Sequence, residues 1–233
     1  MNNKWRLIDS GFSSGRFNME EDERLFDNFC KGEILPVFRV YGWRPPAFSI
    51  GRFQNPEELL DLEACKRDGM DIVKRITGGG VIFHDDEVTY SLVCSERDIG
   101  KGISVKESYK RLCSFLILFY KKLGLKASFA VENGAYSRSK LNSSFCFSGR
   151  EEYDIVINGK KIGGNAQRRK RDVIFQHGSI PISIDRELPL RYLKEKPKNL
   201  EFTCLREEGV PLNFSELKEL LLESFKEVFF LNS

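Results

Sequence analysis

A run of three glycines between two strand-like segments is the feature that most restricts how this chain can fold. Gly78, Gly79 and Gly80 stand between Ile72-Val73 and Val81-Ile82-Phe83, whose β-branched and aromatic residues are typical of strands. Consecutive glycines lose more backbone entropy on folding than other residues, so a plain turn does not require them. The pattern predicts a glycine-rich hairpin, with or without a bound ligand. Its spacing matches neither the dinucleotide-binding fingerprint nor the phosphate-binding loop.

Charged and titratable groups flank this loop. Arg75 precedes the glycines and His84 follows the second strand-like segment. A ligand that lies on bare glycine backbone would therefore have a cation and an imidazole beside it. Asp85 and Asp86 come next, but two adjacent carboxylates without further ligands indicate a turn rather than a metal site.

A second hairpin is predicted at Asn158-Gly159, a strong two-residue turn signal between the strand-like segments 153–157 and 160–167. Strand alternation places Lys161 and Lys160 on opposite faces. The return segment is rich in small residues, which leave open space beside Lys161; they are Gly163, Gly164 and Ala166, and His177 follows in the next strand-like segment.

The rest of the chain contains strands and amphipathic helices without a linker. Capping-box patterns predict helices that start near Asn18, Ser104 and Asn213. Further strands are expected at residues 5–8, 36–41, 88–94 and 127–131. We expect one α+β domain over residues 1–233, with a mixed sheet and helices packed largely on one face.

Composition excludes several classes of protein. A net charge of +3 over 233 residues does not indicate a nucleic-acid partner, although it permits an acidic protein partner. The N-terminus does not resemble a signal peptide, and the apolar run 115–120 is too short to span a bilayer. Six cysteines without a CxxC pair, and only two histidines, do not suggest a zinc site. We therefore expect a cytoplasmic protein with no membrane or nucleic-acid partner.

Several motifs, in this order, resemble the lipoate/octanoate protein ligase and transferase family. The main three are Lys74–Asp85, Gly159–Gln167 and Gln176–Ser179, and the segments 5–11, 18–22 and 49–54 also fit, so the resemblance covers nearly the whole chain. It implies a biotin/lipoate ligase-like fold and an acyl site without a metal. The residues implied to line this site are Arg75, Gly78, Gly79, Gly80, His84, Gly164, Ala166 and His177. His177 has a second interpretation as a hydrogen-bonded strand histidine.

The resemblance implies chemistry at two side chains. The Lys161 ammonium would stabilise the oxyanion that develops when the acyl carbonyl is attacked. Cys146, near the end of the aperiodic segment 132–150, matches a branch of octanoyltransferases that use a loop cysteine as the acyl nucleophile. A nearby cation would lower the pKa of this thiol. The segment Glu87–Ser91 also resembles that branch.

Three residues leave alternatives open. Cys204 is a second candidate nucleophile, because a related transferase branch uses a cysteine late in the chain, although the proline and glycine that flank it there are missing here. Gly80 stands where the loop-cysteine branch often has arginine, and ligases also have glycine. Cys146 itself has the alternative interpretation of an unreactive loop cysteine.

The predicted function is octanoyl transfer in lipoate biosynthesis. Cys146 would take octanoyl from octanoyl-acyl carrier protein and pass it to a lysine of a lipoyl domain or glycine-cleavage H protein, without a cofactor. One alternative is an ATP-dependent lipoate–protein ligase that lacks the C-terminal accessory domain and uses ATP and Mg. Because the chain ends soon after its last predicted helix, a ligase would need a second polypeptide or a minimal form. The other alternative is an acyl-binding protein without catalytic activity.

A basic run, Arg168–Arg171, is predicted at the tip of a hairpin. Such a run is usually a solvated turn. In this family it would instead be suited to steer acyl carrier protein or a lipoyl domain, which are typically acidic.

Overall fold

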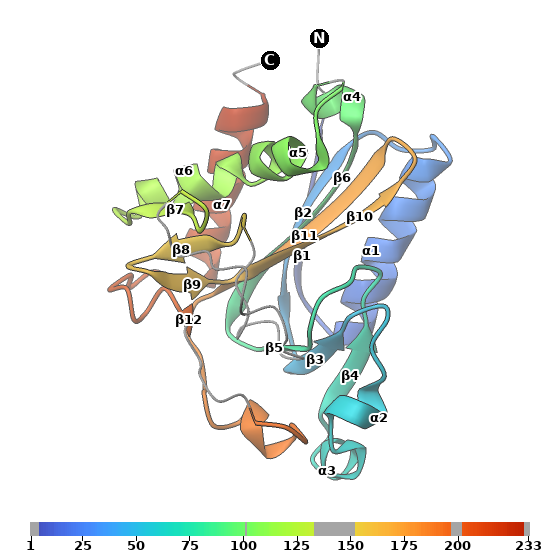
Figure 1. Ribbon diagram of the computed structural model, residues 1–233, viewed down its shortest axis with the longest axis vertical. Coiled ribbons are helices and arrows are strands. Elements are labelled where there is room, and N and C mark those ends of the chain that lie inside the picture. The colour runs from blue at the N-terminus through green and yellow to red at the C-terminus, as the bar shows by residue number, and fades with distance from the viewer. Residues whose placement is uncertain (1–4, 101, 133–151, 197–201, 231–233) are drawn as a thin grey trace.

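A five-stranded sheet in the order β1-β2-β6-β11-β10 forms the centre of the molecule (Figure 1). The computed structural model describes residues 5–100, 102–132, 152–196 and 202–230. Strands β1 and β2 are parallel, and the other neighbours are antiparallel. The strands are β1 (Arg6–Ser13), β2 (Val37–Trp43), β6 (Glu87–Ser95), β10 (Gly164–Lys170) and β11 (Val173–Pro181).

The two faces of this sheet have different roles, as the alternation in β6 shows. Val88, Tyr90 and Leu92 point into the main hydrophobic core, whereas Thr89 and Ser91 make polar contacts on the opposite face. The core face is covered by α5 (Val105–Leu112), α6 (Ser114–Lys122) and α7 (Phe214–Phe229). One face of β6 is therefore core, and the other makes polar contacts.

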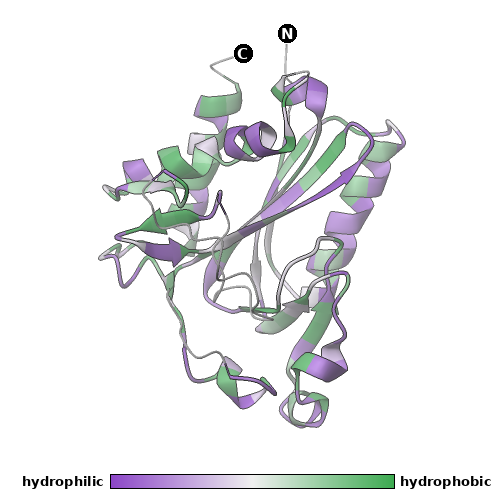
Figure 2. Ribbon diagram, viewed as in Figure 1, coloured by the Kyte–Doolittle hydropathy of each residue, from purple (hydrophilic) through white to green (hydrophobic). Residues whose placement is uncertain are grey.

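Helix α1 (Gly15–Cys30) covers part of the second face of the sheet and packs through Leu25 and Phe26. Figure 2 shows both hydrophobic and hydrophilic bands along it. The structure corrects its predicted start, because Ser14 is the N-cap and Asn18 lies inside the helix. The Asn18 side chain is buried and donates to the Gly42 carbonyl at 3.1 Å.

A small sheet in the order β4-β3-β5 also lies on this side, next to α1 (Figure 1). Its strands are β3 (Ala47–Ile50), β4 (Asp71–Lys74) and β5 (Ile82–His84). β3 lies between the other two, parallel to β4 and antiparallel to β5. The predicted glycine hairpin is therefore wrong: the glycines carry the chain from one edge of this sheet to the other, past the end of β3.

A third sheet, in the order β12-β9-β8-β7, carries Lys161. Its strands are β7 (Ala127–Phe129), β8 (Ile155–Ile157), β9 (Lys160–Ile162) and β12 (Phe202–Thr203). The hairpin at Asn158-Gly159 is confirmed, with φ angles of 51° and 76°. The predicted continuous return strand is wrong, because Gly163, with φ of 70°, ends β9, and the chain then enters the central sheet as β10.

Two helical segments are each divided in two. The segment after Ser104 forms α5 and α6, which meet at Cys113. The segment after Asn55 forms α2 (Pro56–Leu59) and α3 (Leu62–Arg67). A short helix not anticipated from the sequence, α4 (Glu96–Ile99), follows β6, and residues 189–191 form one 3₁₀ turn.

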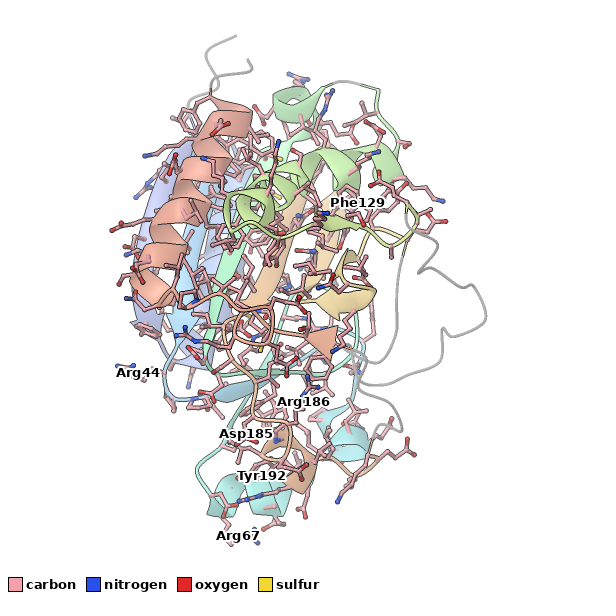
Figure 3. The ribbon with its side chains drawn as sticks, turned by 90° about the vertical axis from the view of Figure 1, so that its left-hand side faces the viewer. Arg44, Arg67, Phe129, Asp185, Arg186 and Tyr192 are labelled. Carbon is pink, nitrogen blue, oxygen red and sulfur yellow. The ribbon has the colours of Figure 1, made fainter. Side chains whose placement is uncertain are left out.

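The segment after β11 reaches back to α3. Tyr192 lies at the same end of the molecule as Arg67 in Figure 3, and its hydroxyl donates to Asp68 at 3.1 Å. The arrangement confirms the α+β class with mixed sheets. Three of the helices share the core face, as predicted, and α1 is opposite. None of the helices in the described part of the chain is long and apolar enough to cross a membrane.

Candidate active site

A cavity of about 450 Å³ opens where the three sheets approach one another. Ser49 and His84 come from the small sheet, Lys161 from β9, and Gly164 from the start of β10. All the side chains and glycines that the resemblance implied lie in its wall, namely Arg75, Gly78, Gly79, Gly80, His84, Gly164, Ala166 and His177, together with Lys161. Cys146 lies outside the described residues.

Arg75 holds the glycine loop in place. Its side chain is 2% exposed, and its guanidinium donates to the Gly78 carbonyl at 2.9 Å and to the Gly80 carbonyl at 2.6 Å. It also donates to the Ser49 carbonyl at 2.9 Å, so it fastens the loop to β3. A guanidinium with several donors in one plane suits this task better than an ammonium. Arg75 therefore shapes the cavity as well as lining it.

The close approach of Gly51 to the glycine loop gives a stability prediction. A Cβ at Gly51 would overlap the Gly79 carbonyl oxygen, whereas a Cβ at Gly78 would meet no atom within 4 Å. We expect Gly51→Ala to lower the free energy of unfolding by about 1–3 kcal/mol, the usual cost of overpacking. Gly78→Ala is the matched control and should unfold close to wild type in urea. Equal stability of the two variants would contradict this packing.

His84 is held on three sides. Its ring stacks on the Trp43 ring, with 3.9 Å between the ring centroids and an angle of 8° between the ring planes. Its Nε2 lies 2.7 Å from the Ser49 hydroxyl, and its Nδ1 lies 2.9 Å from Glu87 Oε1. Glu87 also accepts hydrogen bonds from Thr89 and, at 2.7 Å, from Ser179. Sequence reasoning missed Ser49 and Glu87 as site residues; the signal available was a carboxylate three positions after the motif histidine.

Burial alone would raise the pKa of the Glu87 carboxyl, but its hydrogen-bond partners His84, Thr89 and Ser179 lower it. A buried carboxyl with three donors is stabilised in its charged form. Glu87 is therefore an anion at neutral pH.

Asp22 is the centre of a second buried network. Its carboxylate pairs with Arg39 at 2.7 Å and accepts from Tyr41 at 2.9 Å and from Ser91 at 2.6 Å. Burial would raise its pKa, but His177, Arg39 and Ser91 lower it. Sequence reasoning missed this network, because its members come from α1, β2 and β6 and form no local motif.

His177 is both a hydrogen-bonded strand histidine and a cavity-lining residue, so it fits both interpretations of the sequence. It lies on β11, its Nε2 is 2.7 Å from the Thr77 hydroxyl, and it also lines the cavity. Its Nδ1 is 3.7 Å from Asp22 Oδ2, too far for a good hydrogen bond. Burial lowers the pKa of this imidazole, against the opposing effect of Asp22.

These shifts predict loss of stability in acid. The carboxyls of Asp22 and Glu87 have lowered pKa values in the folded state, so their stabilisation is present above about pH 4 and lost as pH falls below it. The lowered pKa of His177 acts in the same direction from about pH 6.5, because the unfolded chain takes up a proton first. Urea unfolding between pH 7 and pH 3 should show a falling free energy of unfolding; a flat profile would contradict the assignment.

Lys161 is paired with Asp154 inside the protein. The Nζ to Oδ2 distance is 2.7 Å, and the two side chains are 4% and 6% exposed. Lys160 is exposed on the opposite face, which confirms the predicted register. The pair keeps the ammonium charged and fixes its position at the cavity wall, where it can stabilise negative charge on a bound group.

The described cysteines are poor nucleophiles. Cys204 is 2% exposed, does not line the cavity, and has a thiol pKa raised by burial. Burial also raises the pKa of the other free thiols in the described ranges, Cys30, Cys65, Cys94 and Cys113. The structure thus offers no support for Cys204, and the role of Cys146 stays a prediction.

Solved structures define the class of fold. Lipoate-protein ligase A bound with ATP has a TM-score of 0.76 at 22% identity and covers 98% of this chain and 85% of that one. A bi-partite lipoate protein ligase, described with its E2 lipoyl domain from Thermoplasma acidophilum, has a TM-score of 0.71 at 21% identity. The match covers 96% of this chain and 82% of that one. The protein therefore has the fold of lipoate–protein ligases.

Sequence comparison identifies the family. The lipoyl protein ligase A/B catalytic domain matches residues 14–226. Octanoyltransferase LipM of Geobacillus kaustophilus (strain HTA426) is 39% identical over 232 residues, which span 97% of this chain and 84% of that protein. This chain belongs to the lipoyl protein ligase A/B catalytic domain family, which confirms the resemblance of its motifs.

Proposed function

We propose that this protein is an octanoyltransferase of lipoate biosynthesis. The observation that carries the proposal is the buried, charged Lys161 at a cavity whose volume, about 450 Å³, falls in the usual range for small-ligand sites. An identity of 39% over nearly the full chain with an octanoyltransferase supports the same reaction. This favours acyl transfer over the ligase and over an acyl-binding protein without activity.

The proposed reaction has two steps. The Cys146 thiolate attacks the thioester carbonyl of octanoyl-acyl carrier protein, and the carrier thiolate leaves. The ε-amine of a lysine on a lipoyl domain or glycine-cleavage H protein then attacks the new thioester and releases Cys146. Lys161 stabilises the oxyanion formed in each step. Both acyl donors, the carrier thioester and the Cys146 thioester, are already activated. The proposed reaction therefore needs neither ATP nor a metal.

The proposed partners are acidic, and the basic hairpin tip is suited to meet them. Lys170 and Arg171 are exposed at the turn between β10 and β11, whereas Arg168 lies over the Phe26 ring and Arg169 pairs with Glu96. β10 runs from this tip to the cavity wall at Ala166 and Gly164.

We also propose a cytoplasmic location, where the free thiols would stay reduced.

One assay separates the candidate functions. The protein is incubated with octanoyl-acyl carrier protein and an unmodified lipoyl domain, without ATP and with a metal chelator, and the intact mass of the lipoyl domain is measured. We expect the mass increase of one octanoyl group. Modification only with free octanoate or lipoate, ATP and Mg would establish the ligase instead, and no modification in either mixture would indicate a binding protein.

A further inference from the structure

Ser49, His84 and Glu87 form a continuous hydrogen-bonded series in the cavity wall. The Ser49 hydroxyl is 2.7 Å from His84 Nε2, and His84 Nδ1 is 2.9 Å from Glu87 Oε1. The three residues are 1%, 5% and 4% exposed, so the series is shielded from bulk water. A hydroxyl, an imidazole and a carboxylate in this order can move a proton away from a reacting atom and return it.

The hydrogen bonds of Glu87 fix the tautomer of His84. Glu87 is a carboxylate that accepts from Thr89 and Ser179, and as an anion it can only accept from His84 as well. In the neutral imidazole, the His84 proton is therefore on Nδ1, and Nε2 carries the lone pair. Arg75 donates to the Ser49 hydroxyl oxygen at 3.2 Å, which leaves the hydroxyl proton to point toward Nε2. The relay is thus arranged to accept a proton at Ser49.

Other titratable side chains in the described wall are less suited to this task. Lys161 is held as a cation by Asp154 at 2.7 Å and has no lone pair to accept a proton. His177 lacks a carboxylate at hydrogen-bond distance from its Nδ1. The Tyr41 hydroxyl donates to Asp22, and burial raises its pKa well above the ordinary value. Of the two histidines, His84 alone has a carboxylate within hydrogen-bond distance of one ring nitrogen and a serine hydroxyl at the other.

We propose that His84 is the general base of the second step, with Ser49 as its proton relay and Glu87 as the positioning residue; this rests on the proposed function. The acceptor ammonium first loses one proton to solvent. Its nitrogen then forms the C–N bond and gives a second proton to Ser49, whose own proton passes to His84 Nε2. The C–S bond breaks, its electron pair leaves on the sulfur, and His84 returns its proton there. The products are an amide, a thiol and one proton released to solvent.

The test isolates this step. Wild type and His84→Gln are first loaded with octanoyl from octanoyl-acyl carrier protein, and the acyl-enzyme is verified by intact mass. A lipoyl domain is then added, and the single-turnover rate is measured from pH 5.5 to pH 8.5. From equal amounts of acyl-enzyme, we expect His84→Gln to transfer octanoyl about 100- to 10,000-fold more slowly than wild type, the usual contribution of a general base. The shape of its pH profile should also differ from that of wild type.

Two further variants distinguish a base from a packing residue. Glu87→Gln removes the carboxylate that orients His84, so the shape of the pH profile should change as well. His177→Gln, the matched change at the other cavity histidine, should keep the shape of the wild-type profile. Hydroxylamine is a nucleophile that is already neutral at pH 7, so it should discharge loaded His84→Gln and wild type at similar rates.

Different failures have different meanings. An unchanged profile in His84→Gln, or equally slow discharge by hydroxylamine, would overturn the role of His84. Octanoyl mapped to Ser49 would make that residue a nucleophile and overturn the relay. Failure of wild type to form any acyl-enzyme would instead reject the two-step transfer under "Proposed function".

Discussion

Cys146→Ser should abolish octanoyl transfer. A serine hydroxyl is a much weaker nucleophile than a cysteine thiol at neutral pH, so this variant would form no acyl intermediate. Wild type exposed briefly to octanoyl-acyl carrier protein should gain one octanoyl group, and peptide mapping should place it on Cys146. The group should be lost on addition of a lipoyl domain, as the proposed order of steps requires.

Cys204→Ser is the matched control for this experiment. Cys204 is buried, its thiol pKa is raised, and it lies outside the cavity wall, so its substitution should leave most of the activity. An octanoyl group on Cys204, or full activity in Cys146→Ser, would reject the loop-cysteine assignment and favour the late-cysteine or ligase alternative.

Lys161→Ala should slow acyl transfer by roughly 100- to 1000-fold, the usual effect of losing a preorganised oxyanion donor. Lys160→Ala should have almost no effect, because that side chain is exposed on the other face of β9. Steady-state rates with octanoyl-acyl carrier protein and a lipoyl domain would test this pair. Equal damage from both substitutions would mean that the face of β9 is assigned wrongly.

The buried ion pair complicates this variant, and a second substitution resolves it. Removing Lys161 deletes the cation paired with the Asp154 carboxylate, and breaking a buried pair costs about 3–5 kcal/mol of stability. Lys161→Ala combined with Asp154→Asn removes both charges and should recover much of the melting temperature. Its activity should stay low, whereas recovered activity would show that the single variant had only unfolded.

The residues of the cavity were predictable where a local motif carries them. The glycines 78–80 and Lys161 belong to short patterns whose chemistry is visible in sequence, and they do line one cavity. The Asp22–Arg39 pair was not predictable, because it joins α1 to β2 across 17 positions without a local signature. The same is true of Ser49, whose partner His84 is set by strand pairing between β3 and β5.

The fold errors have physical causes as well. The glycine segment was assigned to a hairpin because its flanking strands are close in sequence, but β3 is a better partner for both and lies between them. Asn18 matched a capping box, but Ser14 caps the helix, and the buried Asn18 amide instead bonds Gly42 and Arg39. Sequence reasoning also missed the end of β9 at Gly163. The Ser179 carbonyl, which is distant in sequence, comes so close to Gly163 that a Cβ would not fit there.

The strand order of the central sheet determines when the cavity comes into existence during folding. β2, β6 and β11 are neighbours in space, yet Phe38 pairs with Leu92, and Leu92 with Gln176, across long stretches of chain. Such non-local pairings form slowly, since loop-closure entropy is lost before the contacts compensate. His177 on β11 lines the cavity, so the cavity wall is complete only after these strands have paired. A nascent or partly folded chain therefore lacks this cavity, and binding of a ligand in it reports on the fully folded molecule.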